Sequence, residues 1–213
     1  MIGEFIDGPL WWFSASFFLI GVAWRIGSIL IRGVKKDLSV ARQSGLPGAV
    51  GTVFRRFLPH PEMVRRTRLH LIAGYMFHIG LIALLFWAAP HMEFLRDRVF
   101  GFGWTPLPHW AFILAAEFAF AGLLILWLHR VLHPVTRMLS DADDHIAAIL
   151  TFLVMLTGCL ALLRSFEGLR LTHLLLAELW LLYFPFSRLM HAFTFVISRS
   201  YTGANYGRHG VKA

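Results

Sequence analysis

The sequence predicts an all-α integral membrane protein, a bundle of five transmembrane helices in a single domain that covers residues 1–213. Hydrophobic residues make up 57% of the chain and charged residues only 15%, and the mean hydropathy is +0.64. Soluble domains carry roughly a quarter charged residues. A membrane-spanning helix needs about 20 mostly apolar residues, and five stretches meet this need: 10–31, 70–90, 109–129, 146–163 and 173–197.

Boundary signals support these stretches in chain order. Trp11 places an aromatic anchor at the outer end of the first helix. A long polar loop with several Gly and Pro residues follows, so only short helical pieces are expected there. The second helix is expected to end at Pro90 and to lead into an outer loop. Three aspartates precede the fourth helix and can cap its first turn: Asp141, Asp143 and Asp144.

The net charge of +8 follows a membrane topology and does not indicate a nucleic-acid surface. Segments on one side of the predicted helices hold 14 Lys and Arg residues, and those on the other side hold 4. Since basic segments face the cytoplasm, the N-terminus is predicted outside and the C-terminus in the cytoplasm of a bacterial or archaeal cell, with membrane lipid as a partner. The N-terminal segment lacks basic residues, which predicts a retained helix and not a cleaved signal peptide.

The chain contains 11 histidines, and ionisable residues inside a membrane are functional candidates by default. On the fifth predicted helix, His173 and His191 are 18 residues apart, so an unbroken helix would present both on one face about 27 Å apart. The antiparallel second helix offers His70, His78 and His91. Imidazoles from facing helices can hold haem iron for electron transfer. The alternative is that these histidines only hydrogen-bond neighbouring helices.

Two short runs carry a family resemblance. One is Phe77-His78-Ile79-Gly80, and the other is Leu-Tyr-Phe-Pro-Phe-Ser-Arg-Leu-Met-His, which ends at His191. Both resemble haem-ligand segments of the respiratory nitrate reductase gamma subunit family, membrane cytochromes with two b haems. In that family a second ligand lies 18 residues before the last one, where this chain has His173. The resemblance extends over nearly the whole chain, and its specificity rests on these two motifs.

The resemblance implies a five-helix membrane anchor with two b haems, quinone chemistry near the outer haem and a cytoplasmic iron-sulfur or catalytic partner subunit. It implies that His78 and His191 ligate the inner haem. Arg188, one turn before His191, would neutralise a haem propionate, or would simply reach the membrane interface.

This chain departs from the family at the outer haem. The family has its outer ligand ten residues after the inner one, and this chain has Ala88 there. We expect His91 to replace that ligand opposite His173, with His109 as a less favoured substitute. Otherwise the outer haem is differently ligated, or it is absent and the chain holds one haem.

The predicted function is an electron-transfer subunit of an oxidoreductase complex, with its substrate site on a partner and no catalytic side chain of its own. Related cytochromes serve heterodisulfide-reductase-like, sulfur-cycle and hydrogenase complexes. Glu117 and Glu178 lie at membrane depth, where they either relay quinone protons or are protonated and hydrogen-bonded between helices. Two other readings remain: a haem-free anchor or proton-relaying transporter, and a four-helix cytochrome b with ligands on other helices.

Overall fold

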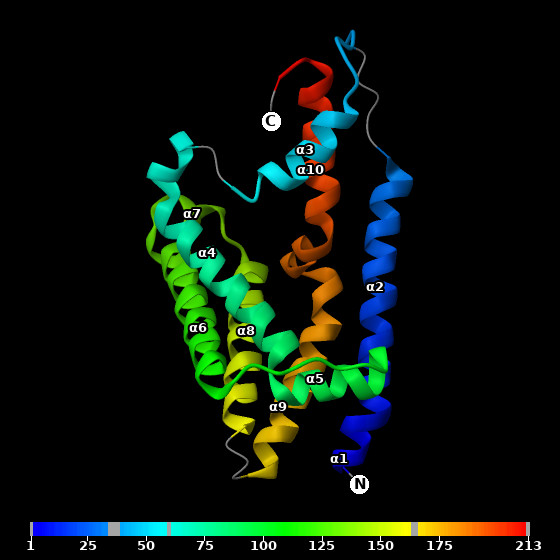
Figure 1. The fold of residues 1–213 in the computed structure, drawn as a ribbon, viewed down its shortest axis with the longest axis vertical. Coiled ribbons are helices and arrows are strands. Elements are labelled where there is room, and N and C mark those ends of the chain that lie inside the picture. The colour runs from blue at the N-terminus through cyan, green and yellow to red at the C-terminus, as the bar shows by residue number, and fades with distance from the viewer. Residues whose placement is uncertain (1, 34–38, 59–60, 163–165, 212–213) are drawn as a thin grey trace. The chain divides into compact units, whose positions relative to one another are not determined.

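The computed structural model of the protein describes residues 2–33, 39–58, 61–162 and 166–211 (Figure 1). These residues form helices, turns and loops, with no strand among them. Five helical segments are long and apolar enough to cross a membrane, which confirms the predicted fold class: Ile2–Arg32, Thr67–Trp87, His109–Leu132, Ala142–Ala161 and Glu167–Phe186. Residue 163, the predicted end of the fourth helix, and four of the counted basic residues lie outside the described ranges: Lys35, Lys36, Arg164 and Lys212.

The chain divides into two compact units. Unit 1 contains Met1–Val64 and Ala177–Ala213, and unit 2 contains Arg65–Leu176. The expectation of a single domain stays a prediction. The main helices in chain order are α1 Ile2–Phe5, α2 Trp11–Arg32, α3 Leu46–Arg55, α4 Pro61–Trp87, α5 Ala89–Leu95, α6 His109–Leu132, α7 Pro134–Leu139, α8 Ala142–Ala161, α9 Glu167–Tyr183 and α10 His191–Arg208.

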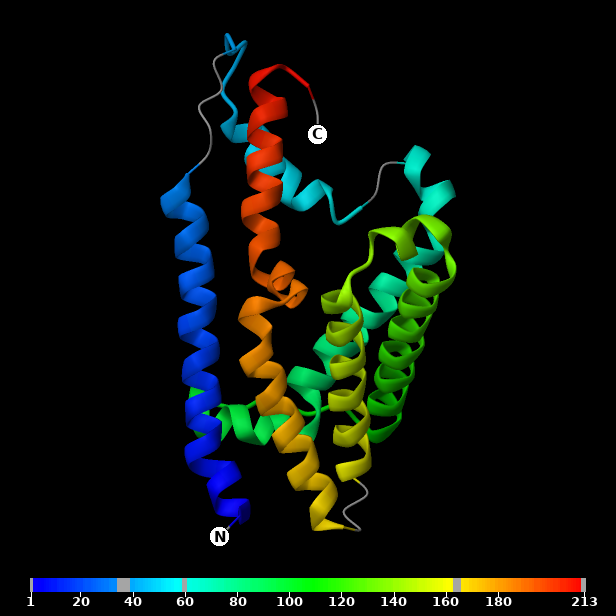
Figure 2. The ribbon, with the colours of Figure 1, turned by 180° about the vertical axis from the view of Figure 1, so that it is seen from behind.

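In unit 2, α4 packs closely on α6, and α6 packs on α8 (Figures 1 and 2). A Cβ atom added at Gly80 would lie 2.5 Å from the Ala115 carbonyl oxygen, so the two backbones touch there. Small residues at such crossings are typical of membrane helix pairs. The core between these helices contains Leu84, Ala116, Ala119, Leu123 and Met155.

The second predicted helix stops earlier than expected, and the outer loop begins with a helix. α4 ends at Trp87, Ala88 is extended, and α5 starts at Ala89. Pro90 lacks an N–H, and its ring would clash with the carbonyl four residues earlier in a continuing helix. That carbonyl, of Phe86, instead accepts a hydrogen bond from Trp104 Nε1 at 2.8 Å. His91 therefore lies on a separate helix.

The prediction of one fifth helix over 173–197 is wrong. α9 is followed by two 3₁₀ turns, Phe184–Phe186 and Arg188–Met190, before α10 begins at His191. Pro185 cannot donate to the helix ladder, and Ser187 is extended with φ −103° and ψ 174°. Ser187 Oγ closes the break, because it donates to Phe184 O at 3.0 Å and accepts from Leu189 N at 3.2 Å. The five-turn spacing therefore no longer relates His173 to His191.

In unit 1, α3 packs on α10 through glycines. A Cβ at Gly203 would lie 2.2 Å from the Gly48 carbonyl oxygen, and Thr52 beside it is completely buried. Arg199 on α10 donates to Val53 O at 3.1 Å and lies over the Phe57 ring at 4.5 Å. The described part of the predicted polar loop thus contains one short helix, which is held against α10, and its last residues belong to the start of α4.

Candidate functional site: four histidines with fixed ring orientations

All four histidines predicted as haem ligands bond a backbone carbonyl through Nδ1. The acceptors are Gly74 O for His78 at 2.7 Å, Leu84 O for His91 at 3.0 Å, Val154 O for His173 at 3.1 Å and Arg188 O for His191 at 2.7 Å. A carbonyl only accepts, so Nδ1 must carry the proton. In a neutral ring this leaves the lone pair on Nε2. Metal-ligating histidines are usually held in this way.

The structure brings two of the four together within unit 2. The rings of His91 on α5 and His173 on α9 are nearly parallel, with an interplanar angle of 19° and centroids 5.9 Å apart. A metal bound at about 2 Å by one nitrogen of each of two imidazoles holds their centroids roughly 6 Å apart. The centroid distance of this pair is therefore close to that of two imidazoles that share one metal ion.

The break after α4 creates this pair. Leu84 O, in the last turn of α4, accepts from Ala88 N at 3.3 Å and also from His91 Nδ1 at 3.0 Å. Burial is the largest influence on His91 and lowers its pKa, while its backbone hydrogen bonds act in the opposite direction. A lowered pKa favours the neutral ring, which is the form that ligates a metal.

Helix α8 also contacts the His173 ring. A Cβ added at Gly158 would lie 3.0 Å from His173 Cε1, so the glycine makes space for the imidazole. Thr157 Oγ1 lies 3.4 Å from His173 Nδ1, the same nitrogen that bonds Val154 O. No motif in the sequence marks these three residues. Their signal, Thr-Gly within an apolar helix, is too common to single out without the tertiary contact.

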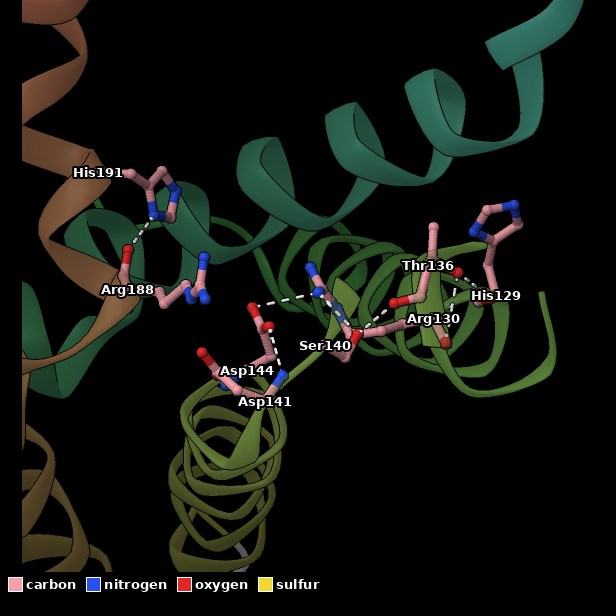
Figure 3. A network of polar contacts seen from close by, with 8 residues as sticks. All are labelled: His129, Arg130, Thr136, Ser140, Asp141, Asp144, Arg188 and His191. Carbon is pink, nitrogen blue, oxygen red and sulfur yellow. Dashed lines mark hydrogen bonds and ion pairs between the residues drawn. The ribbon is translucent and has the colours of Figure 1, made fainter. Parts of the chain in front are cut away.

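The other two predicted ligands lie in different units. His78 is exposed on α4 in unit 2, and His191 is exposed at the first residue of α10 in unit 1. Figure 3 shows the Nδ1 bond from His191 to Arg188 O. The Arg188 side chain is exposed. Ligation of one haem by His78 and His191 stays a prediction.

A polar network at the start of α8 orders the end of α6 (Figure 3). Arg130 pairs with the buried Asp144 at 3.1 Å and donates to Ser140 Oγ at 3.1 Å. Asp141 and Asp144 form a reciprocal capping box, which confirms the expected cap. Nearby, the His129 and His133 rings stack with centroids 5.0 Å apart. This network fixes the helix that carries Thr157 and Gly158.

Within the described part of the chain, no three His, Cys, Asp or Glu side chains converge to hold a metal ion. A porphyrin supplies the iron with four nitrogens of its own, so haem requires only two axial side chains. The fold and these histidines define a class, a multi-pass helical membrane protein in which two imidazoles, of His91 and His173, lie side by side in unit 2.

Comparisons with known proteins give distant relatives. A protein of Nitratidesulfovibrio vulgaris whose name states no function is 27% identical over 216 residues, which cover 95% of this chain and 92% of that protein. The Hdr-like menaquinol oxidoreductase cytochrome b-like subunit of Archaeoglobus fulgidus is 24% identical over 259 residues, which cover 90% of this chain and 77% of that subunit. No protein-family model and no solved structure matches the chain. Membership of the nitrate reductase gamma family is not confirmed.

Proposed function

We propose that this chain is the cytochrome b-like subunit of a membrane oxidoreductase complex. It passes electrons between the quinone pool and a cytoplasmic iron-sulfur partner subunit. The observation that carries the proposal is the His91–His173 pair, with its ring spacing of 5.9 Å and both Nδ1 atoms engaged by carbonyls. The cytochrome b-like relative from Archaeoglobus fulgidus and the two ligand-like motifs support it independently.

The residues of this chain bind and orient the redox group in this proposal. A b haem supplies one-electron chemistry when it is bound. His91 and His173 would hold the iron of the outer haem, and the carbonyls of Leu84 and Val154 hold their rings in place. Gly158 leaves room for the His173 ring. At the inner site, His78 and His191 provide the corresponding nitrogens.

Arg188 is proposed to pair with a propionate of the inner haem. Its side chain is exposed, and its own carbonyl orients His191. A guanidinium binds a carboxylate through two parallel hydrogen bonds, which an ammonium cannot reproduce. An Arg188→Lys variant should therefore still bind the inner haem, but less tightly.

A reduced-minus-oxidised optical spectrum of the purified membrane protein tests the proposal. We expect the α band of a b-type cytochrome and two haems per chain, and we expect a naphthoquinol to reduce them. A protein purified from haem-replete cells without any b-type band would exclude the cytochrome function. The chain would then be a haem-free membrane anchor.

The proposed topology has its own test. With Cys159→Ser as background, single cysteines are introduced as Gly103→Cys, after α5, and His209→Cys, after α10. An impermeant thiol reagent added to intact cells should label the first and not the second, because basic segments are retained in the cytoplasm. The reverse labelling pattern would invert the topology without affecting the haem assignment.

A further inference from the structure

Unit 1 contains two buried polar side chains without a hydrogen-bond partner. Ser14 on α2 is 0% exposed and Glu178 on α9 is 3% exposed. Among the described residues, neither Ser14 Oγ nor either carboxyl oxygen of Glu178 has a partner. The expected hydrogen bond from Glu178 to a neighbouring helix is therefore not found within the described chain. Buried polar groups are nearly always paired, so these two require a functional explanation.

The two residues lie at the same level of a parallel helix pair. α2 and the chain from residue 177 onward run side by side in the same direction in both views (Figures 1 and 2). A Cβ at Gly21 would lie 2.6 Å from Pro185 Cγ, and the Phe18 and Phe184 rings pack with centroids 5.2 Å apart. These contacts set the register of the pair.

Counting back from that register brings Ser14 and Glu178 opposite each other. Ser14 precedes Gly21 by seven residues, and Glu178 precedes Pro185 by seven. Seven residues are about two helical turns and roughly 10 Å of rise, so both side chains return to the faces that meet at Gly21 and Pro185. Asp7, two turns nearer the N-terminus than Ser14, lies within electrostatic reach of Glu178.

The chemistry of these groups matches a quinone headgroup. A serine hydroxyl can donate to a quinone carbonyl, and a carboxylate can accept from a quinol hydroxyl. Two aromatic residues of the same helix pair, Phe18 and Trp180, pack against the cluster of Val22, Phe184 and Met190, and aromatic rings suit a flat apolar ring system. We propose that Ser14 and Glu178 form the site where the quinone substrate binds and exchanges its protons. This inference rests on the proposed function and names the residues at which the quinone would bind.

Quinol oxidation releases two protons and two electrons. The two O–H bonds of the quinol break, and each proton in turn binds a carboxylate oxygen of Glu178 and leaves past Asp7 to water. The two electrons would pass, one each, to two oxidised haem groups held by the histidines. Quinone reduction uses the same groups in reverse, so the assay does not depend on the physiological direction. Glu178 follows His173 by five residues on α9.

A Glu178→Gln variant tests the proton role, since glutamine keeps the shape and cannot take up the proton. We expect quinol-driven haem reduction to slow by about 100-fold, at the lower end for loss of a general base. Haem content and reduction by dithionite should stay unchanged. Ser14→Ala should raise the apparent KM for naphthoquinol several-fold. The matched control is Glu117→Gln, because Glu117 is exposed on α6.

Quinol-driven reduction in Glu178→Gln within twofold of wild type would overturn the inference and leave the cytochrome function standing. A wild-type protein without haem would overturn the cytochrome function instead. Dicyclohexylcarbodiimide labelling of the wild-type protein gives a readout that is independent of haem and of variant folding. The reagent should modify Glu178, and naphthoquinone should protect it. No labelling, or equal labelling with and without naphthoquinone, would also overturn the inference.

Discussion

The proposed outer and inner ligand pairs differ in how well the polypeptide itself positions their rings. His91 and His173 are half-buried in one unit, with rings 5.9 Å apart and supported by α8. His78 and His191 are exposed, lie in different units and bond carbonyls of their own local turns. Preorganised ligands lose less entropy on binding. The outer site should therefore keep its haem more firmly than the inner site.

The largest effect is expected from removing an outer ligand. His173→Ala or His91→Ala should each halve the haem content, because an axial ligand held on this scaffold has no replacement. Pyridine haemochrome assay of the purified protein measures this. His109→Ala, at the exposed start of α6, should retain both haems. Loss of haem in His109→Ala with full haem content in His91→Ala would show that His109, and not His91, is the ligand opposite His173.

Weakening the structure that supports His91 and His173 should affect the outer haem more than the inner haem. Asp144→Ala removes the buried partner of Arg130 and half of the α8 capping box. Since Arg130 is 37% exposed, solvent screens the pair, and we expect a loss of roughly 1–3 kcal/mol in unfolding free energy. Thermal release followed optically should show the outer haem leaving earlier than in wild type. Asp143→Ala, outside the box, is the control, and an equal shift there would refute the argument.

The inner site should respond to the break before α10. Ser187 Oγ caps the second 3₁₀ turn, and loss of such a cap costs about 1 kcal/mol. Ser187→Ala should therefore weaken retention of the inner haem about five-fold, with the outer haem unchanged. Haem transfer to apomyoglobin, followed over time, measures both sites. Faster loss of the outer haem alone would show that the break does not position His191.

The smallest effect is expected at Gly158. An alanine there brings a methyl group to 3.0 Å from His173 Cε1, so the ring must shift by a few tenths of an ångström. We expect a two- to three-fold faster loss of the outer haem by the same transfer assay. Gly74→Ala is the matched control on α4, because a Cβ there meets nothing within 4 Å. An equal effect of both substitutions would argue against tight packing at His173.

The amino-acid sequence alone determined the membrane class and the number of spans, but not the bounds of the fifth span. Long apolar stretches bounded by polar residues can satisfy their backbone groups only as helices in lipid, and the structure has five such helices. The cap at Asp141 was also predictable, because the acidic residues precede an apolar run directly. These features depend on neighbours along the chain, so tertiary contacts were not needed to find them.

Only the tertiary structure decided how the helices break and which side chains meet. A proline in a membrane helix can kink it or end it, and the outcome at Pro90 depends on Trp104, which takes the freed Phe86 carbonyl from outside the helix. The break at Pro185 likewise removed the periodicity that linked His173 to His191. The contact of His91 with His173 and the shared level of Ser14 and Glu178 arise from packing between segments distant in the chain. Local sequence does not encode such distances.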